Sequence, residues 1–344
     1  MAKKTFKERA TQRPATMADV AAKVGVSRQL VGLVFRDAPG VGAETEAKIR
    51  AAAKELGYRP NLAAQSLRRE GSKYIGLVFH ASESSTNEII PAVYKRAAEL
   101  GYQVVLSAIS SDRTDEEAID EVMGHRCDGI ILISSMLSVT RLQKLARTIP
   151  LVSLGRRLTG VRCGVVSSRG ESGVFDAVEY LIGLGHRSIA FIKAKEMLDV
   201  EYRLEGYESA MDKAKLKRVV VSLSGDFTEA GGARAAEKLL ALPSMPTAVV
   251  CSNDQVAFGL VYGLTKAGLV VPEDVSIIGY DDTIAKLPFL DFTTVRQDPE
   301  ELAFAAVDDL SSRIKGDKYL SETFLTSSKL VIRSSTSKPR EAAK

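Results

Sequence analysis

Residues 16–27 read TMADVAAKVGVS, and this stretch decides the fold of the N-terminal part of the chain. Thr16 and Asp19 have the spacing of a capping pair, so we expect a helix to begin here. Gly25 ends that helix, and Ser27 is placed to cap a second helix after a short turn. Two short helices joined in this way form a candidate helix-turn-helix, a motif whose second helix can enter the major groove of DNA.

The segment after this motif is expected to add a third helix and a linker. The helix runs from about Ala43 to Leu56, because acidic residues lie in its first turn and Gly57 follows its end. Residues 60–73, PNLAAQSLRREGSK, could form about two helical turns, too few to be stable alone in water. Three short amphipathic helices can also form a plain bundle, so spacing alone leaves the role of this module open.

Basic charge is concentrated in the N-terminal fifth of the chain. Residues 1–73 carry 15 Lys and Arg against 7 Asp and Glu, a net charge of +8, whereas the remaining residues carry 32 against 36, a net charge of −4. Residues 1–15 are expected to form a disordered basic arm. In the rest of this region the basic residues are interleaved with apolar ones at helical spacing, which favours a nucleic-acid-binding module over a solvated basic tail.

Composition argues against several classes of protein. No run reaches the roughly 18 consecutive apolar residues of a membrane span, and the basic, polar N-terminus lacks the apolar core of a secretory signal. We therefore expect a cytoplasmic protein without membrane association. The three cysteines, Cys127, Cys163 and Cys251, are scattered and fit neither a disulfide framework nor a metal site. The three histidines stand apart from any nucleophile, so we expect no enzyme, no metal and no other cofactor.

From Tyr74 onward, apolar strand-like runs alternate with amphipathic helical stretches. The expected strands occupy residues 74–79, 104–109, 129–134, 150–154, 188–192, 219–223, 247–252 and 276–280. Such alternation predicts parallel sheets covered by helices on both faces. The pattern restarts between Gly164 and Gly173, so we expect two similar lobes. Because ligands of open parallel sheets bind beyond the carboxyl ends of the strands, the cleft between the lobes is the expected pocket.

A set of motifs resembles those of the lactose-repressor (LacI/GalR) family of transcription regulators, in the family's order and over nearly the whole chain. The motifs are TMADVAAKVGVS (16–27), ELGYRPNLAAQSLR (55–68), DGIIL (128–132), LGHRSIA (184–190), RLEGY (203–207), NDQVAFG (253–259), VPEDVSIIGYDD (271–282) and TTVRQ (293–297). The resemblance implies an N-terminal all-α helix-turn-helix domain and a two-lobed α/β domain like that of periplasmic binding proteins, with doubly wound parallel sheets. It further implies a sequence-specific DNA-binding repressor under allosteric control by a small molecule.

The resemblance also implies domain boundaries. Residues 16–59 form the helix-turn-helix domain, and 60–73 form a linker that becomes a hinge helix on specific DNA. Residues 74–333 form the domain for effector binding and dimerisation. Within it, lobe 1 covers about 74–166 plus 298–324, and lobe 2 covers about 167–297 plus 325–333. Residues 334–344 are a polar tail without a leucine heptad, so a dimer is expected rather than a tetramer.

The expected DNA contacts belong to a homodimer on a pseudo-palindromic operator. They are Thr16, Ser27, Arg28, Gln29, Gly32, Leu33, Arg36, Asn61, Ala64 and Leu67. Arg28 and Gln29 have side chains that pair with guanine and adenine. Leu67 matches the family's leucine that wedges between base steps and kinks the duplex. Because Leu33 stands where the family often has a base-reading arginine, we expect an operator that differs from the family's common half-site.

The expected effector is a sugar or sugar derivative, for which the family supplies hydroxyl-binding polar groups and an aromatic face. The expected contacts are His80, Arg156, Arg203, Phe227, Asn253, Asp281 and Gln297. Arg203 matches the family's ligand-clamping arginine, and Phe227 matches an aromatic stacking position. Each has a plain alternative: Arg203 could lie on a helix surface, Phe227 in the core, and Asp281 in the cap of a turn.

The first lobe departs from the family pattern. Residues 80–87, HASESSTN, lack the family's aromatic pair, and Gly155 replaces an aspartate beside Arg156 and Arg157. We therefore expect an unusual or acidic sugar whose charge Arg156 or Arg157 binds.

Two other functions fit parts of the chain. A two-lobed solute-binding protein has the same lobes, but it needs export and leaves residues 16–68 without a role. A sugar-converting enzyme needs an acid/base pair, and the sequence offers none that can be placed. Whether the effector releases or strengthens DNA binding is left open by the sequence.

Overall fold

The computed structural model describes residues 13–35, 38–59, 71–194, 198–223, 227–317 and 323–340. Contacts within the chain define two compact units, residues 1–72 and 73–344. In the described parts, no helix has both the length and the hydropathy that crossing a membrane requires.

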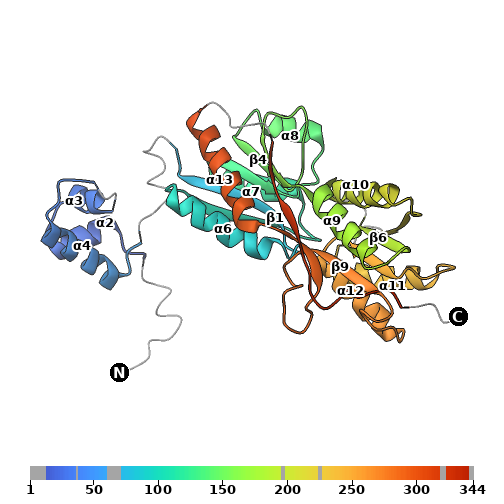
Figure 1. Cartoon of the computed structure of the whole chain (residues 1–344). Helices are drawn as coiled ribbons and strands as arrows, with labels where there is room; N and C mark the ends of the chain where they lie inside the picture. The colour runs from blue at the N-terminus through green and yellow to red at the C-terminus, as the bar shows by residue number, and fades with distance from the viewer. Residues whose placement is uncertain are drawn as a thin grey trace, which may run out of the picture. The chain divides into compact units, whose positions relative to one another are not determined.

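In the residues that the structure describes, the small unit contains three helices that pack on a shared core (Figure 1). They are α2 (Met17–Val24), α3 (Arg28–Val34) and α4 (Ala43–Leu56). Thr16 and Asp19 form the predicted capping box at the start of α2. Gly25 ends α2 with a φ of 74°, a left-handed conformation that glycine adopts without a steric penalty. Val20, Val31 and Ile49 lie at the centre of the core.

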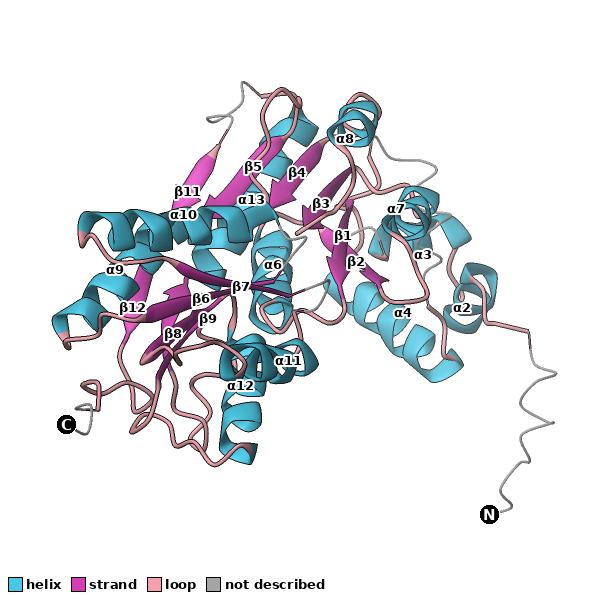
Figure 2. Ribbon diagram, turned by 90° about the vertical axis from the view of Figure 1, so that its right-hand side faces the viewer, coloured by secondary structure: helices cyan, strands magenta, loops and turns pink. Residues whose placement is uncertain are grey.

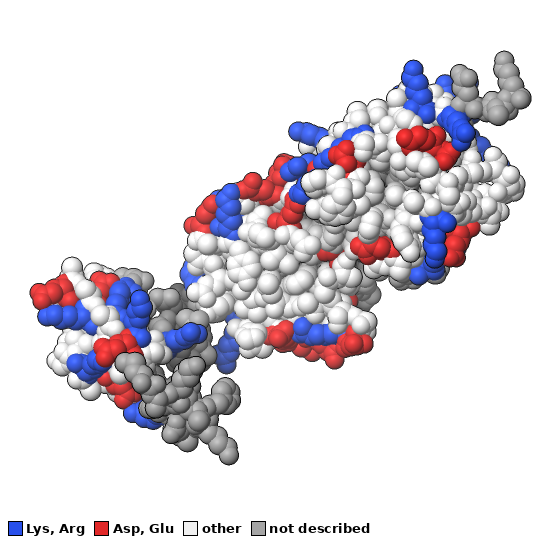
Figure 3. Space-filling model, turned by 90° about the horizontal axis from the view of Figure 1, so that it is seen from below, with Lys and Arg blue, Asp and Glu red and all other residues white. Residues whose placement is uncertain are grey.

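The charge of the small unit is mixed on the face that Figure 3 shows, where Lys and Arg lie among Asp and Glu. Residues 13–35 and 38–59 carry 7 Lys and Arg against 4 Asp and Glu. Most of the positive excess of residues 1–73 therefore comes from residues outside these helices.

Lobe 1 of the large unit is built on a parallel sheet in the order β11-β5-β4-β3-β1-β2. Its strands are β1 (Tyr74–His80), β2 (Gln103–Ile109), β3 (Gly129–Ile133), β4 (Leu151–Leu154), β5 (Gly164–Ser168) and β11 (Phe324–Thr326). Its helices are α6 (Thr86–Glu99), α7 (Asp115–Gly124), α8 (Val139–Leu145) and α13 (Pro299–Lys315). Leu77 packs toward α6 and α13, whereas its neighbour Val78 packs toward α7 and α8, as the alternation of a strand requires.

Lobe 2 repeats this architecture with the strand order β12-β10-β9-β8-β6-β7. Its strands are β6 (Ile189–Ala194), β7 (Val219–Leu223), β8 (Ala248–Cys251), β9 (Ser276–Asp281), β10 (Thr293–Gln297) and β12 (Ser328–Val331), of which β12 alone runs antiparallel. Its helices are α9 (Gly170–Gly183), α10 (Leu198–Lys213), α11 (Glu229–Leu240) and α12 (Asp254–Lys266). One core lies against α9 and α10 and the other against α11 and α12. Figure 2 shows α9 and α10 on one side of the sheet and α11 and α12 on the other.

The chain passes between the lobes three times. It crosses after β5, after β10, and between β11 and β12. Helix α13 therefore belongs to lobe 1, although it follows a strand of lobe 2. These crossings are the covalent connections through which a change in one lobe reaches the other.

The predicted fold class is confirmed, and each of the eight expected strands corresponds to a strand of the structure. The sequence pattern does not predict β5, β10, β11 or β12. Residues 334–340, expected as a polar tail, continue lobe 2. The buried hydroxyl of Ser335 accepts a hydrogen bond from the backbone N–H of Thr293 at 2.8 Å and donates one to the carbonyl of Ile277 at 2.6 Å.

The three cysteines are free and buried. Burial raises the pKa of the Cys127 thiol to about 12, so the reactive thiolate form is disfavoured. Within the described residues, no group of three His, Cys, Asp or Glu side chains is arranged to hold a metal ion.

Candidate functional site

The exposed tip of α3 is formed by Arg28 and Gln29, the first two residues of the helix. The hydroxyl of Ser27 accepts a hydrogen bond from the backbone N–H of Leu30 at 3.1 Å, which fixes where the helix begins. The first turn contains no acidic residue. A guanidinium and a carboxamide are thus exposed at a capped helix end, and these groups can each form two hydrogen bonds with a base edge.

The far end of α3 is held by contacts that the sequence does not predict. Arg50 of α4 donates a hydrogen bond to the carbonyl of Val34 at 3.3 Å and pairs with Glu46 at 2.8 Å. The rings of Phe35 and Tyr58 meet edge to face, with centroids 5.2 Å apart. The spacing of Glu46 and Arg50 by four residues is the one signal that could have pointed to this contact.

The other predicted DNA contacts of the small unit have different surroundings. The hydroxyl of Thr16 hydrogen-bonds the Asp19 carboxylate at 2.7 Å and so belongs to the cap of α2. Leu33 is half-buried. Gly32 is buried with Val31 on the packed side of α3, which corrects the expectation that it faces DNA. Four predicted contacts lie outside the described residues: Arg36, Asn61, Ala64 and Leu67.

A pocket of about 540 Å³, partly open to solvent, lies between the two lobes of the large unit. Its lining includes residues just beyond the carboxyl ends of strands, such as Ser134 after β3 and Asn253 after β8. The lining residues are Glu83, Ser84, Ser85, Ile89, Ile133, Ser134, Leu154, Gly155, Asp199, Arg203, Phe227, Asn253, Gln255, Asp281, Gln297 and Leu302. Arg203, Phe227, Asn253, Asp281 and Gln297 are therefore brought together from distant parts of the sequence.

Arg203 of α10 is fixed in the wall of the pocket and is only 6% exposed. Its guanidinium pairs with Asp199 at 2.5 Å and donates a hydrogen bond to the carbonyl of Ser252. The same group lies over the ring of Tyr280, 3.7 Å from its centroid. These contacts hold the guanidinium in one orientation, which a group that orients a ligand needs.

Asn253 connects the start of α12 to the segment that contains Phe227. The side-chain oxygen of Asn253 accepts the backbone N–H of Val256 at 2.8 Å and caps the helix, while its amide donates to the carbonyl of Phe227 at 3.1 Å. Asn253 therefore positions Phe227 as well as lining the pocket itself.

Two carboxyl groups, of half-buried Asp281 and buried Glu83, complete the polar lining. Asp281 accepts a hydrogen bond from the side-chain amide of Gln297 at 2.6 Å, and burial raises the pKa of Asp281 to about 7. Glu83, in the loop between β1 and α6, is 8% exposed, and burial raises its pKa to about 8. The charges of Asp199 and Asp281 raise the pKa of Glu83 further. The sequence does not single out Glu83, although it follows a strand end as Asn253 does.

His80 and Arg156 are not among the pocket-lining residues. Arg156 turns toward α8 and donates hydrogen bonds to the carbonyls of Ser135 at 2.9 Å and Leu137 at 2.6 Å. Arg157 pairs with Glu171 at 2.6 Å and also lies outside the lining. The expectation that one of these arginines receives an acidic sugar is therefore corrected, because both are engaged elsewhere.

The loop of lobe 1 that contains Glu83 contacts lobe 2 directly. The backbone N–H of Ser84 donates to the side-chain oxygen of Gln255 at 3.1 Å, and its hydroxyl lies 3.0 Å from that of Thr283. Nearby, Glu88 of α6 forms an ion pair with Lys286. The two lobes thus meet across the mouth of the pocket through polar contacts.

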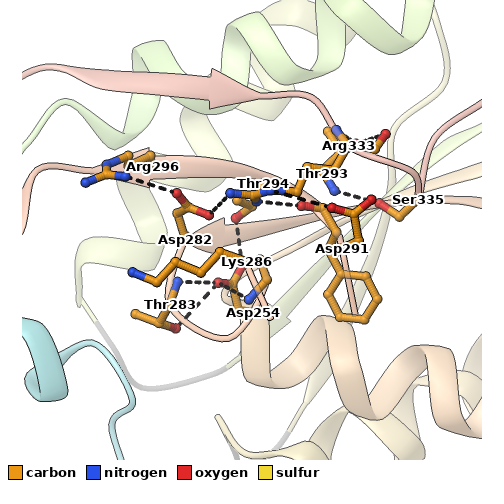
Figure 4. A network of polar contacts seen from close by, with 12 residues as sticks. Asp254, Asp282, Thr283, Lys286, Asp291, Thr293, Thr294, Arg296, Arg333 and Ser335 are labelled. Carbon is orange, nitrogen blue, oxygen red and sulfur yellow. Dashed lines mark hydrogen bonds and ion pairs between the residues drawn. The ribbon is translucent and has the colours of Figure 1, made fainter. Parts of the chain in front are cut away.

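Asp254 joins the loop after β9 to the crossover strand β10 (Figure 4). Its carboxylate accepts hydrogen bonds from the backbone N–H of Thr283 at 2.8 Å and from the hydroxyl of Thr294 at 2.7 Å. Burial raises the pKa of Asp254 to about 6. Asn253 caps α12, which leaves the Asp254 carboxylate free to bind the loop.

Asp282 makes a second connection in the same network. Its carboxylate pairs with Arg333 at 2.6 Å and with Arg296 of β10 at 3.5 Å (Figure 4). The loop that contacts lobe 1 is therefore anchored to β10, which leads directly into α13.

Comparison with known proteins agrees with this geometry. Residues 16–61 match the family of "Bacterial regulatory proteins, lacI family", and residues 178–336 match the "Periplasmic binding protein-like domain". The chain is 32% identical to the "Probable HTH-type transcriptional repressor ExuR" of Bacillus subtilis over 330 residues, which cover 93% of this chain and 98% of that protein.

Solved structures give the same result. The lac repressor dimer bound to operator and the anti-inducer ONPF superposes with a TM-score of 0.79 and 28% identity, covering 94% of this chain and 100% of that one. A complex of the transcriptional regulator CelR with cellobiose superposes with a TM-score of 0.69 and 30% identity, again covering 94% and 100%. Full-length similarity at this level, together with the helix-turn-helix and the two-lobed domain, shows that this chain belongs to the LacI family of bacterial transcription regulators.

Proposed function

We propose that this protein is a homodimeric repressor that binds a pseudo-palindromic operator and responds to a sugar-like effector held between the lobes. The observation that carries the proposal is the capped, exposed tip of α3, where Arg28 and Gln29 occupy the position of base-reading side chains. Two such tips in a dimer read two half-sites, and the symmetry of the protein is matched by that of the DNA.

The proposed effector site is the pocket between the lobes. Arg203, Asn253 and Asp281 offer donors and acceptors to hydroxyl groups, and Phe227 offers an apolar face. A cellobiose complex of a related regulator supports a carbohydrate as the kind of ligand. His80 and Arg156 do not enter this proposal, because neither lines the pocket.

The proposed coupling runs through the contacts between the lobes. A ligand that binds one lobe arrangement better favours that arrangement, and the loop with Thr283 is tied to β10 and so to α13. A coupling free energy of about 1–3 kcal/mol between effector and DNA is typical of such systems. The family's hinge leucine, Leu67, lies outside the described residues, and its wedge role remains a proposal from sequence.

Such a regulator works where the DNA is, which in a bacterium is the cytoplasm. We assign it no catalytic step, because the pocket groups are accounted for by binding and the related proteins are repressors.

The experiment is a gel-shift titration with a duplex selected from random sequences and a shuffled duplex of the same composition. We expect a preference of at least about a thousandfold for the selected duplex, and an affinity for both that falls steeply with salt, because phosphate contacts release counterions. Equal binding to both duplexes at every salt concentration, with and without the candidate sugars, contradicts the proposal.

A further inference from the structure

The charges that line the pocket do not balance. Among the lining residues that the structure describes, the charged ones are Glu83, Asp199, Asp281 and Arg203, three acids and one base. The guanidinium of Arg203 is already paired with Asp199 at 2.5 Å and with the carbonyl of Ser252. Glu83 and Asp281 therefore lack a cationic partner of their own among the lining residues.

Glu83 is the sharper case of the two. Asp281 accepts a hydrogen bond from Gln297 at 2.6 Å, and the carboxyl group of Glu83 has a hydrogen bond with Ser134. One carboxyl oxygen of Glu83, Oε1, is buried and has no hydrogen-bond partner in the described part of the chain, although the side chain lines an open pocket. A buried acceptor of this kind is unfavourable unless a ligand or water satisfies it.

Hydrogen bonds fix the backbone around Glu83 and so the point from which its side chain extends. Its carbonyl accepts a hydrogen bond from the hydroxyl of Thr86 at 2.6 Å, and its N–H donates to the carbonyl of His80 at 3.2 Å. The next residue, Ser84, is hydrogen-bonded to lobe 2 through Gln255. The carboxyl group is therefore presented to the pocket by a fixed turn.

From this arrangement we infer that the effector carries a protonated amine, which pairs with Glu83 and lies near Asp281, on a hydroxyl-bearing skeleton. An amino sugar has this chemistry. The inference rests on the proposed function of the pocket and narrows the class of its ligand. An ammonium group supplies the positive charge and the N–H donors that the unpartnered oxygen needs.

The competing ligand classes fit less well. An acidic sugar brings a further carboxylate into a site that already holds three acidic side chains and whose one guanidinium is engaged by Asp199. A neutral sugar fits only if Glu83 keeps a proton, a state that burial and the charges of Asp199 and Asp281 favour in the empty pocket and that Ser134 and Arg203 oppose. A cationic ligand makes the ionised form favourable, so its binding releases a proton.

The test compares matched sugars at pH 7 by isothermal titration of the full chain. The probes are glucosamine, galactosamine and mannosamine, their neutral parent hexoses, and glucuronate and galacturonate. We expect at least one amine to bind about tenfold or more tightly than its parent, as a charge-assisted hydrogen bond allows, and the uronates to bind more weakly than either. Titrations in two buffers of different ionisation enthalpy should show proton release for the amine alone.

The variant Glu83→Gln keeps the shape of the side chain and removes its charge. We expect it to bring the amine and its parent within about threefold of each other, which is the scatter normal for a single contact, without loss of thermal stability. Glu237→Gln, an exposed acid on α11, is the matched control and should leave the preference intact. A preference that survives Glu83→Gln overturns the assignment to this residue.

Other outcomes count against the inference as a whole. A parent hexose or uronate that binds as tightly as the amine overturns it, and so does a panel in which no amine binds. Failure here is separable from failure of the proposed function, because operator preference in the gel shift is measured with and without sugars and does not depend on which of them binds more tightly. If the protein prefers its operator but does not prefer amines, the proposed repressor function is retained and only the inference that the effector is an amine is wrong.

Discussion

Replacing Asp254 tests whether the buried network of Figure 4 anchors the loop at the pocket. In the wild type, its carboxylate accepts hydrogen bonds from the backbone N–H groups of Thr283 and Ala285, at 2.8 and 3.3 Å, and from the hydroxyl of Thr294 at 2.7 Å. Asp254→Ala leaves these three buried donors without their acceptor, and each unsatisfied donor costs about 1–3 kcal/mol.

The substitution also removes a charge whose burial is unfavourable. The rise of the Asp254 pKa from 3.8 to about 6 corresponds to roughly 3 kcal/mol at pH 7. Loss of the three accepted hydrogen bonds costs about 2 kcal/mol each, and removal of the buried charge recovers about 3 kcal/mol. The net destabilisation expected for Asp254→Ala is therefore about 3 kcal/mol. Asp254→Asn gains the same relief, but it replaces charge-assisted hydrogen bonds with weaker neutral ones to the backbone N–H groups and to Thr294, so the two effects offset and we expect a change within about 1 kcal/mol.

The assay is urea unfolding at pH 7, followed by circular dichroism. Asp254→Ala should lower the midpoint of the large unit clearly, and Asp254→Asn should lie close to the wild type. Asp212→Ala, which removes an exposed acid of α10, is the control and should leave the midpoint unchanged. An alanine variant as stable as the wild type, or an asparagine variant as unstable as alanine, refutes the reasoning.

Three further outcomes are expected. Between pH 4.5 and about 8 the ligand-free protein should lose stability as pH rises, because folded Glu83 holds a proton that the unfolded chain has released. Glu83→Gln should flatten this dependence of stability on pH, measured by thermal unfolding. An unchanged slope in the variant contradicts the argument that burial raises the pKa of Glu83. Arg203→Lys loses the paired contacts to Asp199 and Ser252, so it should remove the effect of the effector on DNA binding in a gel shift and leave effector-free DNA binding intact. An effector response as large as that of the wild type excludes Arg203 as a group that orients the ligand. Ser27→Ala should destabilise α3 by about 1 kcal/mol, measured by hydrogen exchange, whereas Ser27→Asp should not, because its carboxylate can cap the helix. An equal loss of helix stability in both variants argues against the role of Ser27 as the cap.

Local signals explain why the helices of the small unit are predictable from sequence. A capping pair such as Thr16 and Asp19, and a glycine such as Gly25, act over three or four residues and need no distant partner. Buried central strands are predictable for a similar reason, because both faces demand apolar side chains. The edge strands β11 and β12 are short and partly exposed, so they carry no continuous apolar run that would reveal them.

The lining of the pocket is only partly predictable from sequence, because the direction of a side chain decides whether it lines the pocket. Gly155 lines the pocket, whereas the next residue, Arg156, points to the carbonyls of Ser135 and Leu137. A sequence places both residues at the same strand end and cannot separate them. Glu83 lies in a stretch that is polar throughout, and its burial depends on a turn and on lobe 2 groups more than a hundred residues away.

The central claim is that the tip of α3 reads bases, and selection from a randomised duplex library tests it most directly. Wild type, Arg28→Ala and Gln29→Ala are carried through the same selection, with Lys48→Ala of α4 as a control for lost positive charge. The account predicts a two-fold symmetric consensus for the wild type and the control, with each tip variant losing preference at its own base pair by about 1–3 kcal/mol. An identical consensus from all four proteins, or none from the wild type, contradicts it.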